Sequence, residues 1–488
     1  MLKPTFMAAA VAAALLAPAA ASAVNDAEMK ELREQVRQLR EQYEKRIEAL
    51  EQRLQQAEGA AQKAQGTAVK AEGVATTAAD VASKAEAQAV KAESAAIQAN
   101  IRPTSEAAFN PAISVILNGV YANLSQDPGR FRITGFVPTL GEVSPGNRGL
   151  SLGESELALT ANVDHYFRGT LIAALAPDDS IGVEEATIQS LGLSNGLTLK
   201  AGRFFSSVGY QNEIHAHAWD FTDAPLANKV FLGNQLADDG VQIKWLAPTD
   251  TFIEVGAEFG RGRAFPASNR DKNGAGASNL FARLGGDIGT STAWRVGLAH
   301  LATTAQNRNY DDLDSTGTQV NNSFNGKSRL WALDGILKWA PNGNSSSTNF
   351  KLQGEYFRRT ENGNLTYDTA AASLGMQTGA LRSAQSGWYA QGVYQFMPMW
   401  RAGYRYDRLN SGTVRLGLVD SGALGAADFP ILTAYNATRN TLMFDFSPSE
   451  FSRVRLQLAS DKSRLGVTDR QIFLQYTVSL GAHGAHKF

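Results

Sequence analysis

The last residues of the chain, 470–488, carry the pattern that most constrains its fold. Apolar and polar residues alternate there, with Ile472, Leu474, Tyr476, Val478 and Leu480 in one phase and Gln471, Gln475, Thr477 and Ser479 in the other. Such a two-residue period places one set of side chains on each face of a strand. The chain ends in Phe488. A terminal strand that is apolar outside, polar inside and closed by an aromatic residue is typical of an outer-membrane barrel.

The composition fits this prediction and excludes several other classes of protein. The chain has 488 residues and a net charge of −1, which gives no electrostatic sign of a nucleic-acid partner. It has no internal apolar run of about 18 residues that could span a bilayer as a helix. It also has no cysteine, which excludes disulfides and a cysteine-linked lipid anchor.

The amino terminus, residues 1–23, has the pattern of an export signal. Lys3 supplies a positive charge, residues 6–16 form an apolar core, and Ala21-Ser22-Ala23 is a small-residue cleavage site. A first transmembrane helix is the alternative, but the apolar core is too short for one. We therefore predict secretion.

Residues 24–100 predict a periplasmic coiled coil. Apolar residues recur at spacings of three and four from Met29 to Leu54, and alanine then keeps the seven-residue register to Ala96. About 75 residues of such a helix would extend roughly 110 Å. A solitary helix and a disordered tether are the alternatives. Pro103 would end the helix, and residues 101–111 are expected to form a linker.

Residues 112–488 predict an all-β transmembrane barrel. Seven short turns alternate with eight longer connections, which implies about sixteen antiparallel strands with both ends on the turn side. The longer connections include residues 206–236, 303–328 and 360–386. Aromatic residues beside the short turns would form one interfacial girdle, namely Trp245, Trp294, Trp339, Phe396, Trp400 and Phe446. A soluble β-sandwich is the alternative.

This layout resembles the phosphate-selective porin superfamily, especially the dicarboxylate-type porins with an amino-terminal periplasmic coiled coil. The resemblance lies in the signal, the heptads, the barrel, and Gly202-Arg203-Phe204 before a long third connection. It implies a homotrimeric channel in which that connection folds inward and narrows the pore. The family's lysine-rich phosphate site does not carry over, because residues 206–236 contain only Lys229 as a strong cation. The candidate constriction residues are Glu213, His215, His217, Asp220, Asp223 and Lys229.

Charged residues in the polar phase of the strands are the candidate pore lining. The cations lie on the thirteenth to fifteenth predicted strands, and the carboxylates lie on the second, fourth, seventh and eleventh. Cations on one wall and carboxylates on another would orient polar solutes in the pore. The alternative is that these charges pair locally and only solvate the interior. The residues are Arg401, Arg405, Arg439, Arg453 and Arg455, and Glu154, Glu156, Glu185, Glu254, Glu258 and Glu355.

His215 and His217 are also candidate metal ligands, because extended backbone would put both on one face with Glu213 in the same phase. The alternative is a hydrogen-bonded pair within a folded loop. His483 and His486 add to a metal role. We find no nucleophile elbow, HExxH motif or phosphate-binding glycine loop, so we expect neither an enzyme nor a cofactor.

The sequence therefore predicts an outer-membrane porin of a Gram-negative bacterium, with its stalk in the periplasm. Its solutes would be small and hydrophilic. The arginine-rich strands further suggest anionic solutes such as phosphate or carboxylates. Expected partners are the lipid bilayer, lipopolysaccharide, two further copies of the chain and, through the stalk, peptidoglycan. A structural anchor and a metal-binding uptake channel are the alternative functions.

Overall fold

The computed structural model describes residues 111–139, 143–268 and 271–481, together with single residues between Lys30 and Lys63. The chain divides into two compact units, Met1–Ala108 and Phe109–Phe488, and each is described by itself. The single described residues of the first unit are helical and exposed. The predicted signal peptide, most of the predicted coiled coil and linker, and His483, His486 and Phe488 lie outside the described residues. None of the described helices is both long and apolar enough to cross a membrane.

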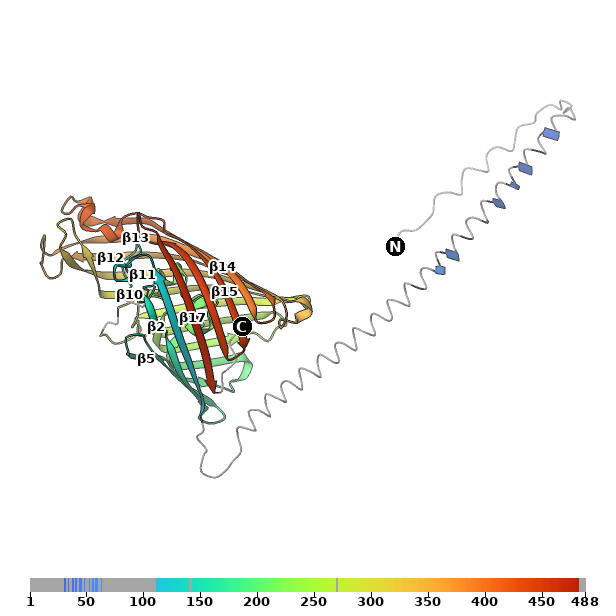
Figure 1. Cartoon of the computed structure of the whole chain (residues 1–488), viewed down its shortest axis with the longest axis horizontal. Helices are drawn as coiled ribbons and strands as arrows, with labels where there is room; N and C mark the ends of the chain where they lie inside the picture. The colour runs from blue at the N-terminus through green and yellow to red at the C-terminus, as the bar shows by residue number, and fades with distance from the viewer. Residues whose placement is uncertain are drawn as a thin grey trace, which may run out of the picture. The chain divides into compact units, whose positions relative to one another are not determined.

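The second unit is one antiparallel sheet that curls into a barrel (Figure 1). Its strands are β1 (Ala112–Leu124), β2 (Gly149–Leu152), β3 (Ser155–Asn162), β4 (Phe167–Leu175), β5 (Ile181–Ser190), β6 (Leu197–Phe205), β7 (Ala237–Leu246), β8 (Phe252–Gly260), β9 (Ala277–Ile288), β10 (Thr292–Leu313), β11 (Gln319–Trp339), β12 (Asn349–Tyr367), β13 (Gln377–Met397), β14 (Trp400–Leu416), β15 (Thr438–Ser449), β16 (Ser452–Lys462) and β17 (Asp469–Gly481).

Pairing between the first and last strands closes the barrel. β1 and β17 run antiparallel from the pair Ser114 and Gly481 to the pair Leu124 and Gln471. β2 and β3 both pair with β1 on its other side, so they form one strand interrupted at residues 153–154. The barrel therefore has sixteen strands, and the predicted strand number is confirmed. Closure leaves no unpaired sheet edge, which is what a strand-built protein needs inside lipid.

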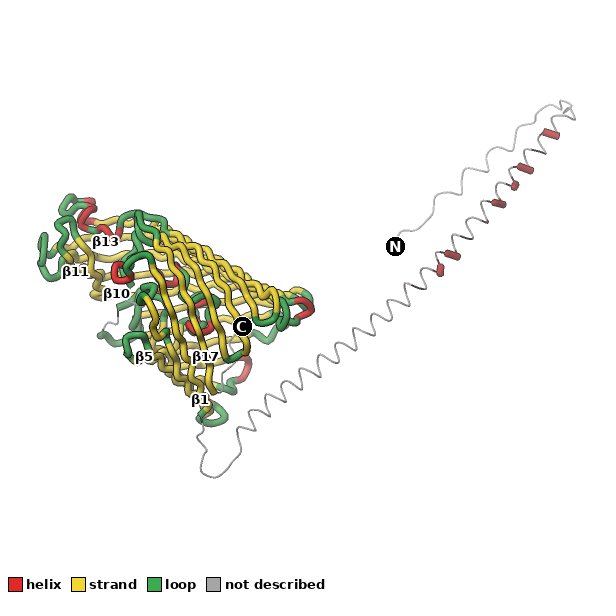
Figure 2. The backbone as a smooth tube through the Cα atoms, viewed as in Figure 1, coloured by secondary structure: helices red, strands yellow, loops and turns green. Residues whose placement is uncertain are grey.

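Short helices lie in the connections between strands (Figure 2). The 3-10 turns are η1 (Pro128–Arg130), η2 (Ser194–Gly196), η3 (Gln211–Glu213), η4 (Ala216–Ala218), η5 (Pro341–Gly343), η6 (Ala426–Asp428) and η7 (Pro430–Leu432). The described α-helices are α2 (Leu226–Leu232) and α3 (Gly417–Asp420).

Two predicted connections, residues 303–328 and 360–386, were wrong in their extent. β10 continues to Leu313 before β11 begins at Gln319, and β12 continues to Tyr367 before β13 begins at Gln377. Charged outward residues such as Lys327 and Arg382 interrupt the apolar period here. The backbone ladder does not need apolar side chains, so these strands continue where their outer face is polar.

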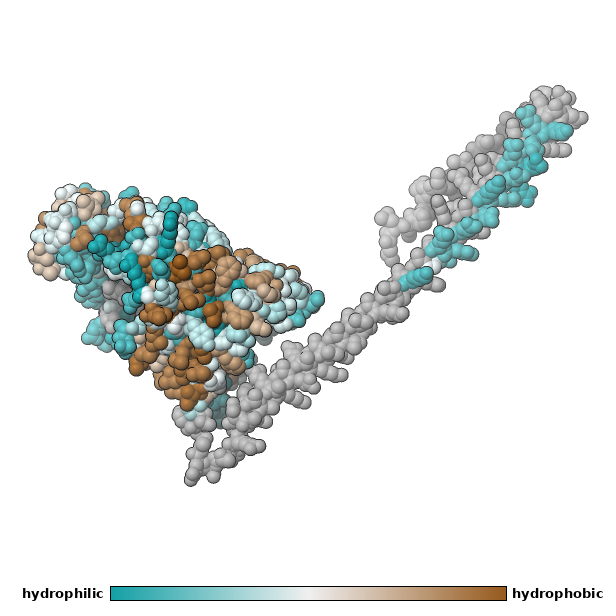
Figure 3. All heavy atoms as spheres, in the orientation of Figure 1, coloured by the Kyte–Doolittle hydropathy of each residue, from teal (hydrophilic) through white to brown (hydrophobic). Residues whose placement is uncertain are grey.

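The outer surface carries a band of apolar side chains (Figure 3). On β17, Leu474 and Tyr476 are 48% and 51% exposed, whereas the alternate residues Phe473 and Gln475 are each 3% exposed. Trp245, Trp339, Phe396 and Trp400 are exposed at strand ends beside the short turns. Such an outer face would be costly in water and suits lipid contact.

The barrel interior holds packed side chains. All seven residues of α2 are buried, and its Leu226, Val230 and Phe231 pack with Leu301, Leu330 and Phe357 of the wall strands. Gly233 ends this helix in the left-handed conformation, at φ 65°, which a glycine adopts without strain. Asp407 of β14 accepts a hydrogen bond from the backbone N–H of Leu226 at the other helix end. α2 is thus fixed to the inner wall at its start and along its length.

Candidate functional site

The third connection, residues 206–236 between β6 and β7, lies inside the barrel. Its side chains and backbone bond to β3, β5, β8, β9 and β12 on one part of the wall and to β14, β15 and β16 on another. Only a segment within the barrel can contact strands from so much of its circumference. η3, η4 and α2 belong to this connection.

The five predicted pore arginines, which we call the arginine wall, lie together on β14, β15 and β16. Arg405, Arg439 and Arg455 are each 1% exposed, and they bond to the third connection and to neighbouring strands. The backbone oxygens of His217 and Trp219 accept hydrogen bonds from Arg453 at 2.6 Å and Arg455 at 2.8 Å. The guanidinium groups of Arg401, Arg405 and Arg455 also pair with Asp445 or Asp407 of the wall.

Asp223 attaches the third connection to the arginine wall. Its carboxylate accepts hydrogen bonds from Arg405 at 3.1 Å, from Gln457 at 3.0 Å, and from Arg439. The ammonium of Lys229 lies 3.4 Å away. Burial alone would raise the pKa of Asp223, but Arg439, Arg405 and Lys229 hold it far below its usual range. The group is therefore a carboxylate at neutral pH.

Asp220 makes a second attachment nearer the turn side of the barrel. It pairs with Lys351 of β12 and with Arg401 of β14, the latter at 3.3 Å. Burial opposes its ionisation, yet Lys351 and Arg401 lower the pKa of Asp220 to about 2. Two aspartates of the connection thus neutralise cations of the arginine wall.

Three glutamates of β3 and β5 surround the two histidines of the connection. His215 Nδ1 lies 3.3 Å from Glu156 and 3.1 Å from Glu184, and its Nε2 lies 3.4 Å from Glu185. His217 Nδ1 lies 2.7 Å from the other oxygen of Glu156. We call these five residues the His–Glu cluster. Burial would lower the pKa of His215, but the glutamates raise it well above its ordinary value.

A β-bulge brings Glu184 and Glu185 into this cluster together. In the β4–β5 pairing, Ile172 lies opposite Glu185 and Ala173 lies opposite Val183, which leaves Glu184 without a partner in the register. Neighbouring residues of a regular strand point to opposite faces, whereas a bulge re-aims one of them. Both glutamates therefore reach the same histidine.

The start of the connection is anchored by two more of the predicted glutamates. Glu258 accepts hydrogen bonds from the Ser207 N–H at 2.8 Å and from Gln242 at 2.7 Å. Glu355 accepts from the backbone N–H groups of Tyr210 and Gln211, the latter at 2.8 Å.

Arg283 connects the wall and the loop in the same region. It pairs with Glu254 of β8 at 2.9 Å and with Glu213 of the third connection. Glu154 lies partly buried at the break between β2 and β3.

Sequence reasoning named most members of this interior and missed several. Asp445 and Lys351 lie in the same two-residue phase as Arg439 and Glu355, so strand phase could have identified them. Glu184 has the wrong phase and could be found only from the bulge. Whether the predicted residues line an aqueous pore stays a prediction.

Comparisons with known proteins identify similar structures and a relative in sequence. No family model matches the sequence. Among solved structures, similar folds include a loop-L8 deletion mutant of OmpT, an outer membrane protein of Vibrio cholerae, at 10% identity and a TM-score of 0.47 over 76% of this chain and 99% of that one. OprB of Pseudomonas putida is 14% identical with a TM-score of 0.45, covering 76% of this chain and 94% of its own. The outer membrane channel DcaP of Acinetobacter baumannii is 12% identical with a TM-score of 0.43, covering 77% and 99%.

An uncharacterized protein of Aquifex aeolicus (strain VF5) is 30% identical over 416 residues, which cover 80% of this chain and 82% of that protein. The chain belongs to the same family as this Aquifex protein.

Proposed function

We propose that the protein is an outer-membrane porin, a diffusion channel for small hydrophilic solutes that is narrowed by residues 206–236. The observation that carries the proposal is the third connection inside a closed barrel, bonded to opposite parts of the wall. The apolar outer band supports contact with lipid, and the charged inner face supports a polar lumen.

A cavity on the turn side of the barrel suggests which solutes would enter. It has a volume of about 510 Å³, and its charged lining residues are Lys338, Lys351, Arg401 and the carboxylate Asp287. Asp220 and Asp445 pair with two of these three cations. Three cations and one carboxylate line this mouth, and we propose phosphate or carboxylates as the class of solute.

Planar-bilayer recording of the purified protein tests the proposal. We expect stepwise conductance, and a salt gradient should give a reversal potential that reports a preference for anions. Folded protein that inserts into the bilayer and never conducts would overturn the channel function.

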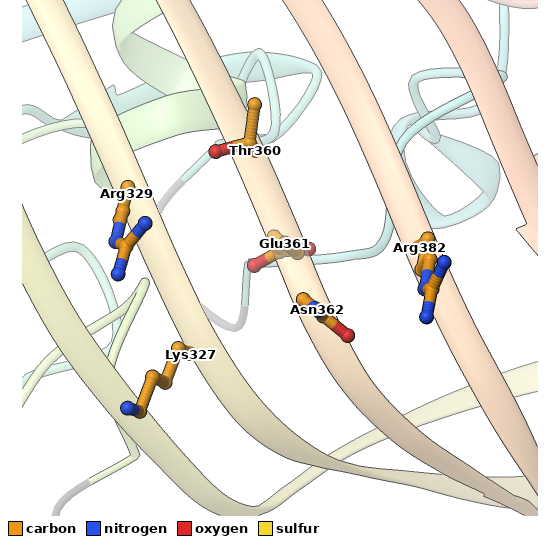
Figure 4. Close-up of a pocket in the computed structure, with 6 residues that line it drawn as sticks. All are labelled: Lys327, Arg329, Thr360, Glu361, Asn362 and Arg382. Atoms are coloured by element: carbon orange, nitrogen blue, oxygen red, sulfur yellow. The ribbon is translucent and has the colours of Figure 1, made fainter.

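Basic residues on the outer face support an orientation with the longer connections outside the cell. Lys327, Arg329 and Arg382 lie on β11 and β13 around a depression that Thr360 and Asn362 of β12 also line (Figure 4). These side chains are exposed on the loop half of strands whose other half carries apolar residues. Phosphate groups of lipopolysaccharide in the outer leaflet would match them, because arginine and lysine bind phosphate strongly.

We expect the triple substitution Lys327→Ala, Arg329→Ala and Arg382→Ala to reduce the lipopolysaccharide that copurifies with the barrel. Each removed contact is a charge-assisted hydrogen bond, worth about 1.5–3 kcal/mol. Phosphate analysis of the purified protein measures the bound lipid. Replacing the exposed turn residues Asp164 and Asp250 with alanine should leave that amount unchanged. Equal lipid content in all variants would contradict the assignment.

The remaining proposals concern the first unit and the assembly. We propose that residues 1–23 are an export signal and that residues 24–100 form a periplasmic coiled coil joining three barrels. An anchor whose stalk reaches peptidoglycan is a second candidate function, favoured by the buried packing around α2. Deleting residues 24–100 distinguishes the two, because a porin should still conduct whereas an anchor should lose its attachment to the cell wall.

A further inference from the structure

The His–Glu cluster has the donors and spacing of a metal site. One oxygen from each of Glu156 and Glu184 and one nitrogen of His215 lie within 4.8 Å of one another. Glu156 is 3% exposed, and His215, His217 and Glu184 are at most 17% exposed in their side chains. Three carboxylates thus converge on two imidazoles in a largely buried place, and buried charges in proteins are either paired or bound to a metal.

The separations of the donor atoms fit a bound ion. Two ligands each about 2.1 Å from zinc lie about 3.0–3.4 Å apart when the angle at the metal is between 90° and tetrahedral. His215 Nδ1 is 3.3 Å from Glu156 and 3.1 Å from Glu184. A small rearrangement of these side chains would place an ion between the three donors.

The surrounding groups have the pattern of an outer ligand shell. A metal-bound histidine usually donates its second ring N–H to a carboxylate, and bound carboxylates are themselves hydrogen-bonded. Glu185 lies 3.4 Å from His215 Nε2, which would be the free ring nitrogen. His217 Nδ1 lies 2.7 Å from Glu156 Oε1. The other oxygen of Glu156, Oε2, is the one that faces His215.

We propose that Glu156, Glu184 and His215 bind a divalent transition-metal cation of the zinc type, with Glu185 and His217 orienting the ligands. An imidazole donor argues against Ca²⁺ and Mg²⁺, which take oxygen ligands. Copper(I) prefers sulfur ligands, and no cysteine is present. The mixed imidazole and carboxylate set matches zinc and its neighbours.

The location of the site gives it a structural consequence. Glu156 is on β3, Glu184 is on β5, and His215 is in the third connection. A bound ion would therefore join the connection to β3 and β5, strands that Asp223 does not contact. The bulge in β5 turns Glu184 toward the site and so makes it available as a ligand.

Calorimetric titration of Zn²⁺ into detergent-purified protein stripped with EDTA tests the proposal. We expect one Zn²⁺ per chain. Glu184→Gln and His215→Ala should abolish this binding, and Glu185→Gln should weaken it about 10–100-fold because it leaves the ligands in place. His165→Ala removes an exposed turn histidine and should bind like the original protein.

Absence of Zn²⁺ binding to the original protein would overturn the proposal, as would loss of binding in His165→Ala equal to that in His215→Ala. Heat-dependent migration of the barrel on gels verifies that each variant is folded. The titration needs no conductance, so it can succeed or fail independently of the porin function.

Discussion

Asp223→Ala is expected to release the third connection from the arginine wall and to raise the channel conductance. The substitution removes the carboxylate that Arg405, Arg439, Lys229 and Gln457 share. Three cations would then remain buried without it. Removing one partner of a buried ion pair costs about 3–5 kcal/mol, and here it makes the docking of the connection to the wall less favourable by that amount.

The barrel itself should survive this change. Asp223 contributes no backbone pairing to the strand ladder, which closes through β1 and β17. A docking penalty of about 3–5 kcal/mol raises the undocked fraction by a factor on the order of 10²–10⁴. Single-channel recording should therefore show larger and noisier steps than the original protein.

Two variants serve as controls for this prediction. Asp223→Asn keeps an oxygen that can accept from Gln457, so its effect should be smaller. Asp250→Asn changes an exposed aspartate in the turn between β7 and β8 and should have no effect. Unchanged conductance and noise in folded Asp223→Ala would show that the arginine wall does not hold the connection in place.

The barrel could be predicted well because lipid contact and backbone pairing both leave a two-residue period in the sequence. The pairing of the last strand with the one that begins at Ala112 follows from the even strand number and the need for closure. The ends of β10 to β13 were missed, since residues such as Lys327 face water there and the apolar period stops while the ladder continues.

The interior contacts could be predicted only in part. Strand phase predicts the inner face for Arg439 and Glu258, which are both buried, but it says nothing about their partners. Asp223 and Arg439 are 216 residues apart in the chain, so their pairing depends on the closed barrel and the folded connection. Glu184 was missed because a bulge reverses its side, and a single inserted residue leaves no periodic signal.

The double substitution Lys351→Ala and Arg401→Ala is expected to shift the ion preference of the channel toward cations. Both side chains line the cavity on the turn side and hold Asp220 as a carboxylate. Without them, Asp220 would keep its charge or take up a proton, and in either case the mouth loses positive charge. A unit charge about 8 Å from an ion in water contributes about 0.5 kcal/mol.

Each charge attracts anions and repels cations by this amount, so the loss of two charges should change the ratio of anion to cation permeability by about 2 kcal/mol, roughly thirtyfold, and less at high salt because ions screen them. Reversal potentials across a salt gradient measure this ratio. Lys327→Ala with Arg329→Ala is the matched control, since it removes the same charge from the outer face of β11. If the control shifts the ratio as much as Lys351→Ala with Arg401→Ala does, the permeating ions do not pass the turn-side cavity. If the ratio shifts in Lys351→Ala with Arg401→Ala and not in the control, the cavity lies on the conduction path.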